Sequence, residues 1–182
     1  KKEQGIKQAF WYLAIIALIG TVLGTIFLLL FPPSPEQLNL LSSFLGEEET
    51  TNLQAKIAQA STPQGIIWGG VKTYAQFLIG SFIVAAILHV WLLLFGGRAS
   101  YGKTYQLLVY SGTPSYLFSW IPTIGGLMII YRFILLAIGA QHTHGLSKAR
   151  AIWMIVIPAL LFILILVIAG ALFLSFASQL PG

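Results

Sequence analysis

The sequence has 182 residues, of which 57% are hydrophobic and only 8% are charged. Soluble domains are also about half apolar, but about a quarter of their residues carry a charge. The low charge therefore excludes a water-soluble enzyme, a disordered chain and a nucleic-acid-binding domain. The sequence contains neither cysteine nor aspartate, which excludes disulfides, thiolate chemistry and most sites for hard metal ions. The composition indicates an all-α integral membrane protein.

Five apolar segments are candidates to cross a hydrocarbon core of about 30 Å as helices. The first segment is too long for a signal peptide and is followed by Pro32-Pro33 rather than a cleavage site, so we expect a retained helix. The third is interrupted at Gly112–Pro114, and a tight turn at Ile121–Gly125 separates it from the short fourth. The spans predicted for this single membrane domain are residues 10–31, 74–95, 105–121, 126–140 and 151–177, with an outer loop at 32–73. Thr62-Pro63 offers an earlier start for the second helix, since threonine caps helices and proline favours the first turn.

Basic residues are concentrated in every second connection, and therefore on one side of the predicted bundle. Three lysines against Glu3 precede the first span. The loops after the second and fourth spans carry Arg98, Lys103, Lys148 and Arg150. Cytoplasmic loops are enriched in lysine and arginine, so we predict a cytoplasmic N-terminus and an extracytoplasmic C-terminus. The net charge of +5 is then explained by anionic lipid headgroups rather than by nucleic acid.

The first extracytoplasmic loop contains an amphipathic segment. Ser34–Gln37 forms a capping box, and the apolar residues that follow recur at helical spacing. We expect a short helix that lies on the membrane surface or over the bundle. Residues 51–60 form either a further helical turn or a solvated connector.

Residues Gly97–Thr104 match the nucleotide-binding pattern G-x-x-x-x-G-K-[ST]. In that motif the loop follows a buried strand, whereas here it follows a predicted membrane helix. The magnesium ion in such sites is usually held by an aspartate, which this sequence lacks. We interpret the match as a coincidence and expect no nucleotide binding.

Two further groups of residues resemble reactive sites without completing one. Ser111 with a later histidine is reminiscent of an intramembrane serine protease, but the glycine two residues before the serine is absent. His142 and His144 do not share a helix face, and no carboxylate is nearby to complete a metal site with His89. We interpret the pair as polar loop residues and His89 as an interhelical hydrogen-bonding group, and we expect no enzyme activity, metal or cofactor.

Arg132 lies within the fourth predicted span, where charged residues are costly and usually functional. No span contains a carboxylate, so its partner is either lipid phosphate or Glu47–Glu49 reached by snorkelling, or backbone carbonyls freed at Gly112–Pro114. We favour a structural anchor over a substrate-binding charge.

Gly20 and Gly24 have G-x-x-x-G spacing, which serves packing within the bundle or dimerisation.

The stretch from His89 to Arg150 contains loosely spaced glycines, prolines and aromatic residues: Gly96-Gly97-Arg98 then Ser100, Tyr110 with Pro114, Ile121-Pro122 before Gly125, and Gly139 before His144. With these residues the stretch resembles the Yip domain family, the Ypt/Rab-interacting membrane proteins. The resemblance implies five spans, a cytosolic N-terminus, and homo- or hetero-oligomers that act in membrane traffic, with no catalytic residues. A sequence without aspartate lacks the family's Asp-Leu-x-Gly-Pro motif, which argues against Rab binding and for the prokaryotic branch, and hence for the plasma membrane.

We therefore expect a non-enzymatic protein that acts through lipids or membrane-protein partners. The alternative is a small transporter or lipid-handling protein with a polar path near Arg132. The candidate polar residues are Arg132, His89, Tyr110, Ser111, Pro114, Tyr131, His142 and His144.

Overall fold

The structure is a computed structural model that describes residues 5–31 and 62–177, with side chains described to residue 171. The described chain forms five helices and contains no strand: α1 (Ile6–Leu30), α4 (Pro63–Leu94), α5 (Tyr101–Phe118), α6 (Ile124–His144) and α7 (Lys148–Ala177). The all-helical prediction and the number of helices are confirmed. The predicted amphipathic segment at 34–45 and Glu47–Glu49 lie outside the described residues.

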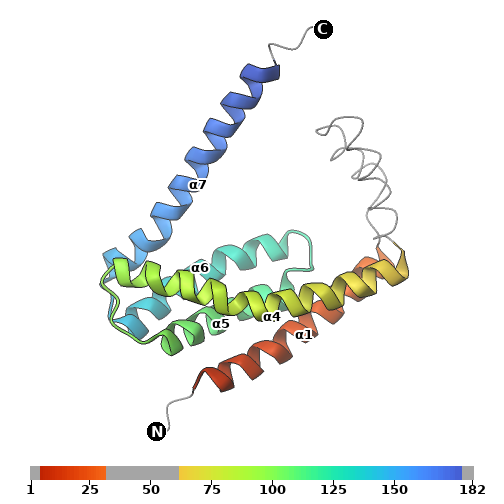
Figure 1. The fold of residues 1–182 in the computed structure, drawn as a ribbon, viewed down its shortest axis with the longest axis horizontal. Helices are drawn as coiled ribbons and strands as arrows, with labels where there is room; N and C mark the ends of the chain where they lie inside the picture. The colour runs from red at the N-terminus through yellow and green to blue at the C-terminus, as the bar shows by residue number, and fades with distance from the viewer. Residues whose placement is uncertain (1–4, 32–61, 178–182) are drawn as a thin grey trace.

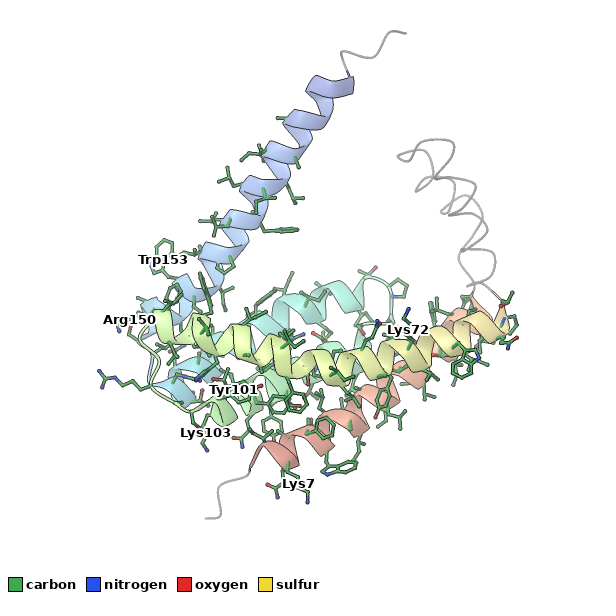
Figure 2. All side chains as sticks on the ribbon, viewed as in Figure 1. Lys7, Lys72, Tyr101, Lys103, Arg150 and Trp153 are labelled. Atoms are coloured by element: carbon green, nitrogen blue, oxygen red, sulfur yellow. The ribbon has the colours of Figure 1, made fainter. Side chains whose placement is uncertain are left out.

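Helices α1, α4, α5 and α6 lie side by side, and α7 rises away from them (Figure 1). The chain reverses direction at each connection within the described residues. As a result, the start of α1, the end of α4, the start of α5, the end of α6 and the start of α7 gather at one end of the molecule (Figure 1). We call this the basic end, because Lys7, Lys103 and Arg150 lie there, whereas Lys72 lies toward the other end (Figure 2).

The helices extend beyond the apolar segments that predicted them. Helix α4 begins at Pro63 because the Thr62 side chain accepts a hydrogen bond from the Gly65 amide at 3.0 Å. The earlier helix start offered by Thr62-Pro63 is therefore correct, and the span predicted at residues 74–95 lies within α4 and its C-cap residue Phe95. At 32 residues and 1.5 Å per residue, α4 is about 48 Å long, which exceeds the hydrocarbon core.

Four of the five described helices are long and apolar enough to cross a membrane, and α5 is the exception. Helix α5 packs against α1, α4 and α6, and three of its hydroxyl residues, Thr104, Ser111 and Ser115, are buried. A helix that is covered by other helices does not need a lipid-compatible surface. Its low hydropathy is thus explained by its central position.

The interruption predicted at Gly112–Pro114 is wrong, because α5 continues through Pro114 to Phe118. Nearby hydroxyls supply polar contacts: Thr113 donates to the Val109 carbonyl at 3.4 Å and lies 3.1 Å from the Tyr12 hydroxyl of α1. Side-chain hydroxyls and neighbouring helices are known to stabilise proline within membrane helices. The turn expected after α5 is present, with Ile124 N donating to Pro122 O at 2.7 Å.

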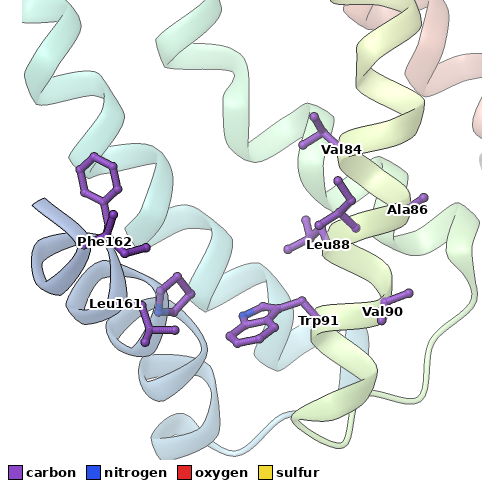
Figure 3. A pocket seen from close by; sticks show the side chains of 10 residues that line it. Val84, Ala86, Leu88, Val90, Trp91, Leu161 and Phe162 are labelled. Carbon is purple, nitrogen blue, oxygen red and sulfur yellow. The ribbon is translucent and has the colours of Figure 1, made fainter. Parts of the chain in front are cut away.

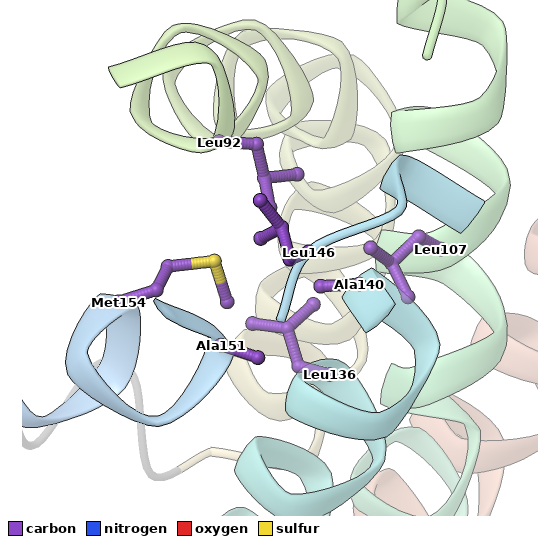
Figure 4. Packing of buried hydrophobic residues seen from close by; sticks show 7 residues of the cluster. All are labelled: Leu92, Leu107, Leu136, Ala140, Leu146, Ala151 and Met154. Atoms are coloured by element: carbon purple, nitrogen blue, oxygen red, sulfur yellow. The ribbon is translucent and has the colours of Figure 1, made fainter. Parts of the chain in front are cut away.

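Two buried clusters hold the helices together. One cluster joins α1, α4 and α5 and consists of Ala9, Leu13, Ala85, Tyr105, Leu108 and Val109. The other lies at the basic end, where α4, α5, α6 and the first turns of α7 converge (Figure 4). It consists of Leu92, Leu107, Leu136, Ala140, Leu146, Ala151 and Met154. Beyond these first turns, α7 departs from the bundle: every side chain from Leu160 to Ile168 is more than half exposed.

The G-x-x-x-G spacing in α1 serves packing within the molecule. A Cβ atom on Gly20 would overlap the backbone carbonyl oxygen of Tyr116, and one on Gly24 would lie 3.2 Å from Trp120 Cβ. Gly20 therefore faces the second half of α5, and Gly24 faces Trp120 in the turn that follows α5. The absence of side chains lets the backbones of α1 and α5 approach closely.

Candidate functional site at the basic end

A buried threonine joins three helices at the basic end. Thr104, at the start of α5, has no exposed surface. Its Oγ1 atom lies 2.8 Å from His89 Nδ1 of α4 and 3.0 Å from His144 Nε2 of α6. A hydroxyl group has one proton to donate, so at least one of the two imidazoles must donate an N–H to it. The three side chains form a polar bridge that fixes the ends of α4, α5 and α6 relative to one another.

His144 was expected to be a polar loop residue, and this prediction is wrong. Helix α6 continues to His144 and ends at Gly145, which adopts the left-handed conformation (φ 66°). The imidazole of His144 is only 3% exposed, while His142 in the same turn is exposed. Because the glycine ends the helix one residue later, α6 is long enough to bring His144 under the end of α4.

Gly96 and Gly97 make room for two side chains from other helices. A Cβ atom on Gly97 would lie 2.9 Å from His144 Nδ1 and 2.9 Å from the Leu92 carbonyl oxygen. Gly96 has a positive φ of 88°, and its Cβ would lie 2.7 Å from Arg150 Nη1. The two glycines thus allow the imidazole and the guanidinium to approach the backbone after α4.

A polar cavity of about 500 Å³ opens beside these glycines. It lies between the loop after α4, the end of α6 and the first turn of α7. Its lining residues are Gly96, Arg98, Ala99, Thr143, His144, Gly145 and Arg150. The cavity overlaps the start of the nucleotide-like pattern, but the Thr104 hydroxyl of that pattern is bound to the two histidines rather than free for a magnesium ion.

An apolar groove of about 900 Å³ lies between α4 and α7 on the side of the bundle (Figure 3). The α4 wall contains Trp91, whose side chain points toward α7 and donates a hydrogen bond to the Met154 carbonyl at 2.9 Å. The α7 wall contains Pro158, Leu161, Phe162 and Ile165. We call this the lateral groove.

Toward the opposite end, a third cavity of about 550 Å³ lies between α1, α4 and α5. Its walls contain many small residues, among them Gly20, Gly24, Gly65, Gly69 and Gly70. Small side chains leave space between the helices there without any charged group.

The polar residues predicted around Arg132 do not meet in one place. Arg132 is half-buried, and its guanidinium carbon lies 5.3 Å from the centre of the Tyr116 ring, a partner that sequence reasoning did not consider. Ser111 is buried and donates to the Leu108 carbonyl of its own helix at 3.3 Å, while Tyr110 and Tyr131 are 40% and 46% exposed. Arg132, Tyr110, Ser111, Tyr131 and Pro114 line none of the three cavities described above, whereas Tyr116 lines the cavity between α1, α4 and α5.

We expect the replacement of Arg132 by glutamine to lower the free energy of unfolding in detergent by about 1 kcal/mol, because a cation above an aromatic ring contributes about 0.5–2 kcal/mol. The pairing is measured by a double-mutant cycle with Tyr116→Leu. In the Tyr116→Leu background, Arg132→Gln should lower the free energy of unfolding by much less than in the wild type. Tyr116→Phe keeps the ring and is the matched control. An equal loss in both backgrounds would show that Arg132 acts through another partner.

Thr104, Arg98 and Arg150 were not predicted as site residues. A signal was present in the predicted topology, which places the end of the second span, the start of the third and the end of the fourth on one side of the membrane. His89, Thr104 and His144 occupy these three positions. Their polar side chains could have been grouped on that basis.

Comparison with known proteins gives one match. The family model of the Yip1 domain matches residues 1–169. No curated protein and no solved structure matches the chain. The family match covers all of α1, α4, α5 and α6 and most of α7, so this chain belongs to the Yip1 domain family of multi-pass membrane proteins.

Proposed function

We propose that this protein is a non-enzymatic membrane protein that pairs with a second copy of itself through the lateral groove, and that it acts in membrane organisation or trafficking. Family membership supports the polytopic architecture. The observation that carries the proposal is the lateral groove together with the exposed apolar side chains of α7 beside the groove. We further propose that the basic end faces the cytoplasm, since basic residues favour the cytoplasmic side. We also propose that the protein resides in the plasma membrane, on the basis of its resemblance to the prokaryotic branch of the family.

We infer that α7 of a second copy occupies the groove, because the same helix exposes apolar side chains that other helices do not cover. Nine consecutive side chains, Leu160–Ile168, are more than half exposed on every face of α7. A two-fold pair in which α7 of each copy enters the groove of the other would cover both surfaces at once. Such an interface would be held by side-chain packing, since lipid tails are as apolar as the groove.

The transporter alternative has less support. A polar path would require a cavity lined by Arg132, and none of the three described cavities has Arg132 in its walls. The charged side chain instead lies above an aromatic ring. We therefore place the function at the surfaces of the bundle rather than along its axis.

We expect Phe162→Cys in the groove to cross-link to a second copy in native membranes with a short bifunctional maleimide. The sequence has no cysteine, so the introduced thiol is the reacting group. Ile67→Cys is the matched control, because Ile67 is an exposed apolar residue (51%) on α4 outside the groove. Leu161→Trp should reduce the dimer band of the Phe162→Cys chain by filling the groove. A monomer in both cysteine variants, or cross-links to other proteins alone, would contradict self-pairing.

A further inference from the structure

The polar cavity at the basic end has two guanidinium groups in its walls. Arg98 comes from the loop after α4, and Arg150 comes from the first turn of α7. Neither side chain has a hydrogen bond or an ion pair with another described residue. The described ranges contain no carboxylate side chain, because all five glutamates lie in residues 1–4 and 32–61. The positive charge of this cavity is therefore not balanced by the part of the chain that the structure describes.

The position of Arg150 adds to the imbalance. Lys148 and Arg150 both lie in the first turn of α7, which contains no acidic residue. The N-terminus of a helix carries a partial positive charge, so basic side chains there are unfavourable and an anion is favourable. An anion beside Arg150 would offset the charge of the side chain and that of the helix end together.

The third polar group in the wall is His144. Its Nε2 atom is engaged by Thr104, but its Nδ1 atom is buried and has no hydrogen-bond partner among the described residues. A buried polar atom without a partner is costly. Gly97 lies over this nitrogen, and glycine backbone can shift to admit a ligand atom more easily than any other residue can. Thr143 does not compete for the ligand as a donor, because its hydroxyl donates to the Gly139 carbonyl at 2.8 Å.

The chemistry of these groups selects the class of ligand. Two guanidiniums repel a metal cation and match the oxygen atoms of a phosphate group, to which arginine donates paired hydrogen bonds. A cavity of about 500 Å³ is within the usual size range of small-molecule sites. It lies at the basic end, where anionic headgroups are found if this end faces the cytoplasm.

We propose that the cavity formed by Arg98, Arg150 and His144 is a binding site for a phosphate group. The two guanidiniums hold the phosphate oxygens, and the imidazole supplies a further hydrogen bond through Nδ1 after a small shift of Gly97. The source of the phosphate is an anionic phospholipid headgroup or free phosphate. Because the site is separate from the lateral groove, it does not depend on self-pairing.

The test uses the purified full chain, a double variant Arg98→Gln/Arg150→Gln and a charge-matched control Lys7→Gln/Lys103→Gln. The control removes two positive charges from the same end of the molecule without touching the cavity. Lipid retention is measured by native mass spectrometry after release from nanodiscs of phosphatidylcholine with phosphatidylglycerol or phosphatidic acid. Thermal unfolding with added inorganic phosphate is measured in nanodiscs of phosphatidylcholine alone.

For a headgroup, the cavity variant should retain at least about tenfold less anionic phospholipid than the wild type, because it lacks both guanidiniums that donate to the phosphate oxygens. The control should retain nearly as much as the wild type. For free phosphate, the wild type and the control should gain thermal stability on addition of phosphate, and the cavity variant should not. Equal retention and equal thermal response in all three proteins would overturn the proposal. Equal losses in the cavity variant and the control would also overturn it, since they would show attraction by general surface charge.

Discussion

Replacing Gly20 by alanine should lower the free energy of unfolding in detergent by about 2–3 kcal/mol, a large effect for the addition of one methyl group. The added Cβ atom would overlap the backbone carbonyl oxygen of Tyr116 in α5. A flexible side chain could turn away, but a helix backbone cannot, so α1 and α5 would have to separate. The loss is measured from reversible unfolding of the purified protein in a mild detergent.

The matched control for this prediction is Gly80→Ala in α4. No atom of another helix lies within 4 Å of the Cβ position at Gly80, and alanine favours helix over glycine by up to about 1 kcal/mol. The control should therefore be neutral or slightly stabilising. If both substitutions were neutral, the result would contradict the close contact between the backbones of α1 and α5 at Gly20.

Replacing Thr104 by valine should destabilise the protein by about 2–4 kcal/mol, although the two side chains have nearly the same shape. The substitution removes the hydroxyl that lies between His89 Nδ1 and His144 Nε2. Each buried polar group that loses its partner costs about 1–3 kcal/mol. The loss is measured by the same unfolding experiment, together with hydrogen exchange at the ends of α4 and α6, which should become faster.

Thr104→Ser distinguishes loss of the hydroxyl from loss of packing. Serine keeps the hydroxyl and removes only the methyl group of a fully buried side chain, which should cost about 1 kcal/mol. A serine variant that is as unstable as the valine variant would contradict the bridging role of the hydroxyl.

The number of helices and the alternation of their ends could be predicted because both follow from lipid as a solvent. Apolar length defines a spanning helix, and basic residues define one side. The helix ends were less predictable, since apolar length does not show how far a helix continues into the interface. Capping residues do show it: Thr62 marks the start of α4 and Gly145 marks the end of α6. The prediction took the start of α4 from Thr62 but did not take the end of α6 from Gly145.

Helix α5 was the hardest to predict, for a physical reason. Its polar residues and Pro114 are typical of a broken helix when only the sequence is considered. In the structure, α1, α4 and α6 surround it, and its hydroxyls find partners such as the Met128 carbonyl, to which Ser115 donates at 2.9 Å. Tertiary packing thus explains a segment whose own sequence is ambiguous.

The candidate site was predicted only in part. His89 and His144 were both singled out, but the threonine between them was assigned to a different pattern. Their meeting depends on the relative heights of three helices, and a difference of one turn, about 5.4 Å, would separate them. Sequence spacing alone does not determine these heights.

We propose that all five described helices cross the membrane, with α5 as the covered central span and the basic end in the cytoplasm. Ser100 and Thr123 flank α5, are exposed, and make no side-chain capping hydrogen bond. Single cysteines at these two positions, in a sequence without any cysteine, can be tested in intact cells with a membrane-impermeant maleimide. We predict labelling of Thr123→Cys from outside and labelling of Ser100→Cys only after permeabilisation. Labelling of both positions from the same side would contradict the account, because α5 would then not cross the membrane.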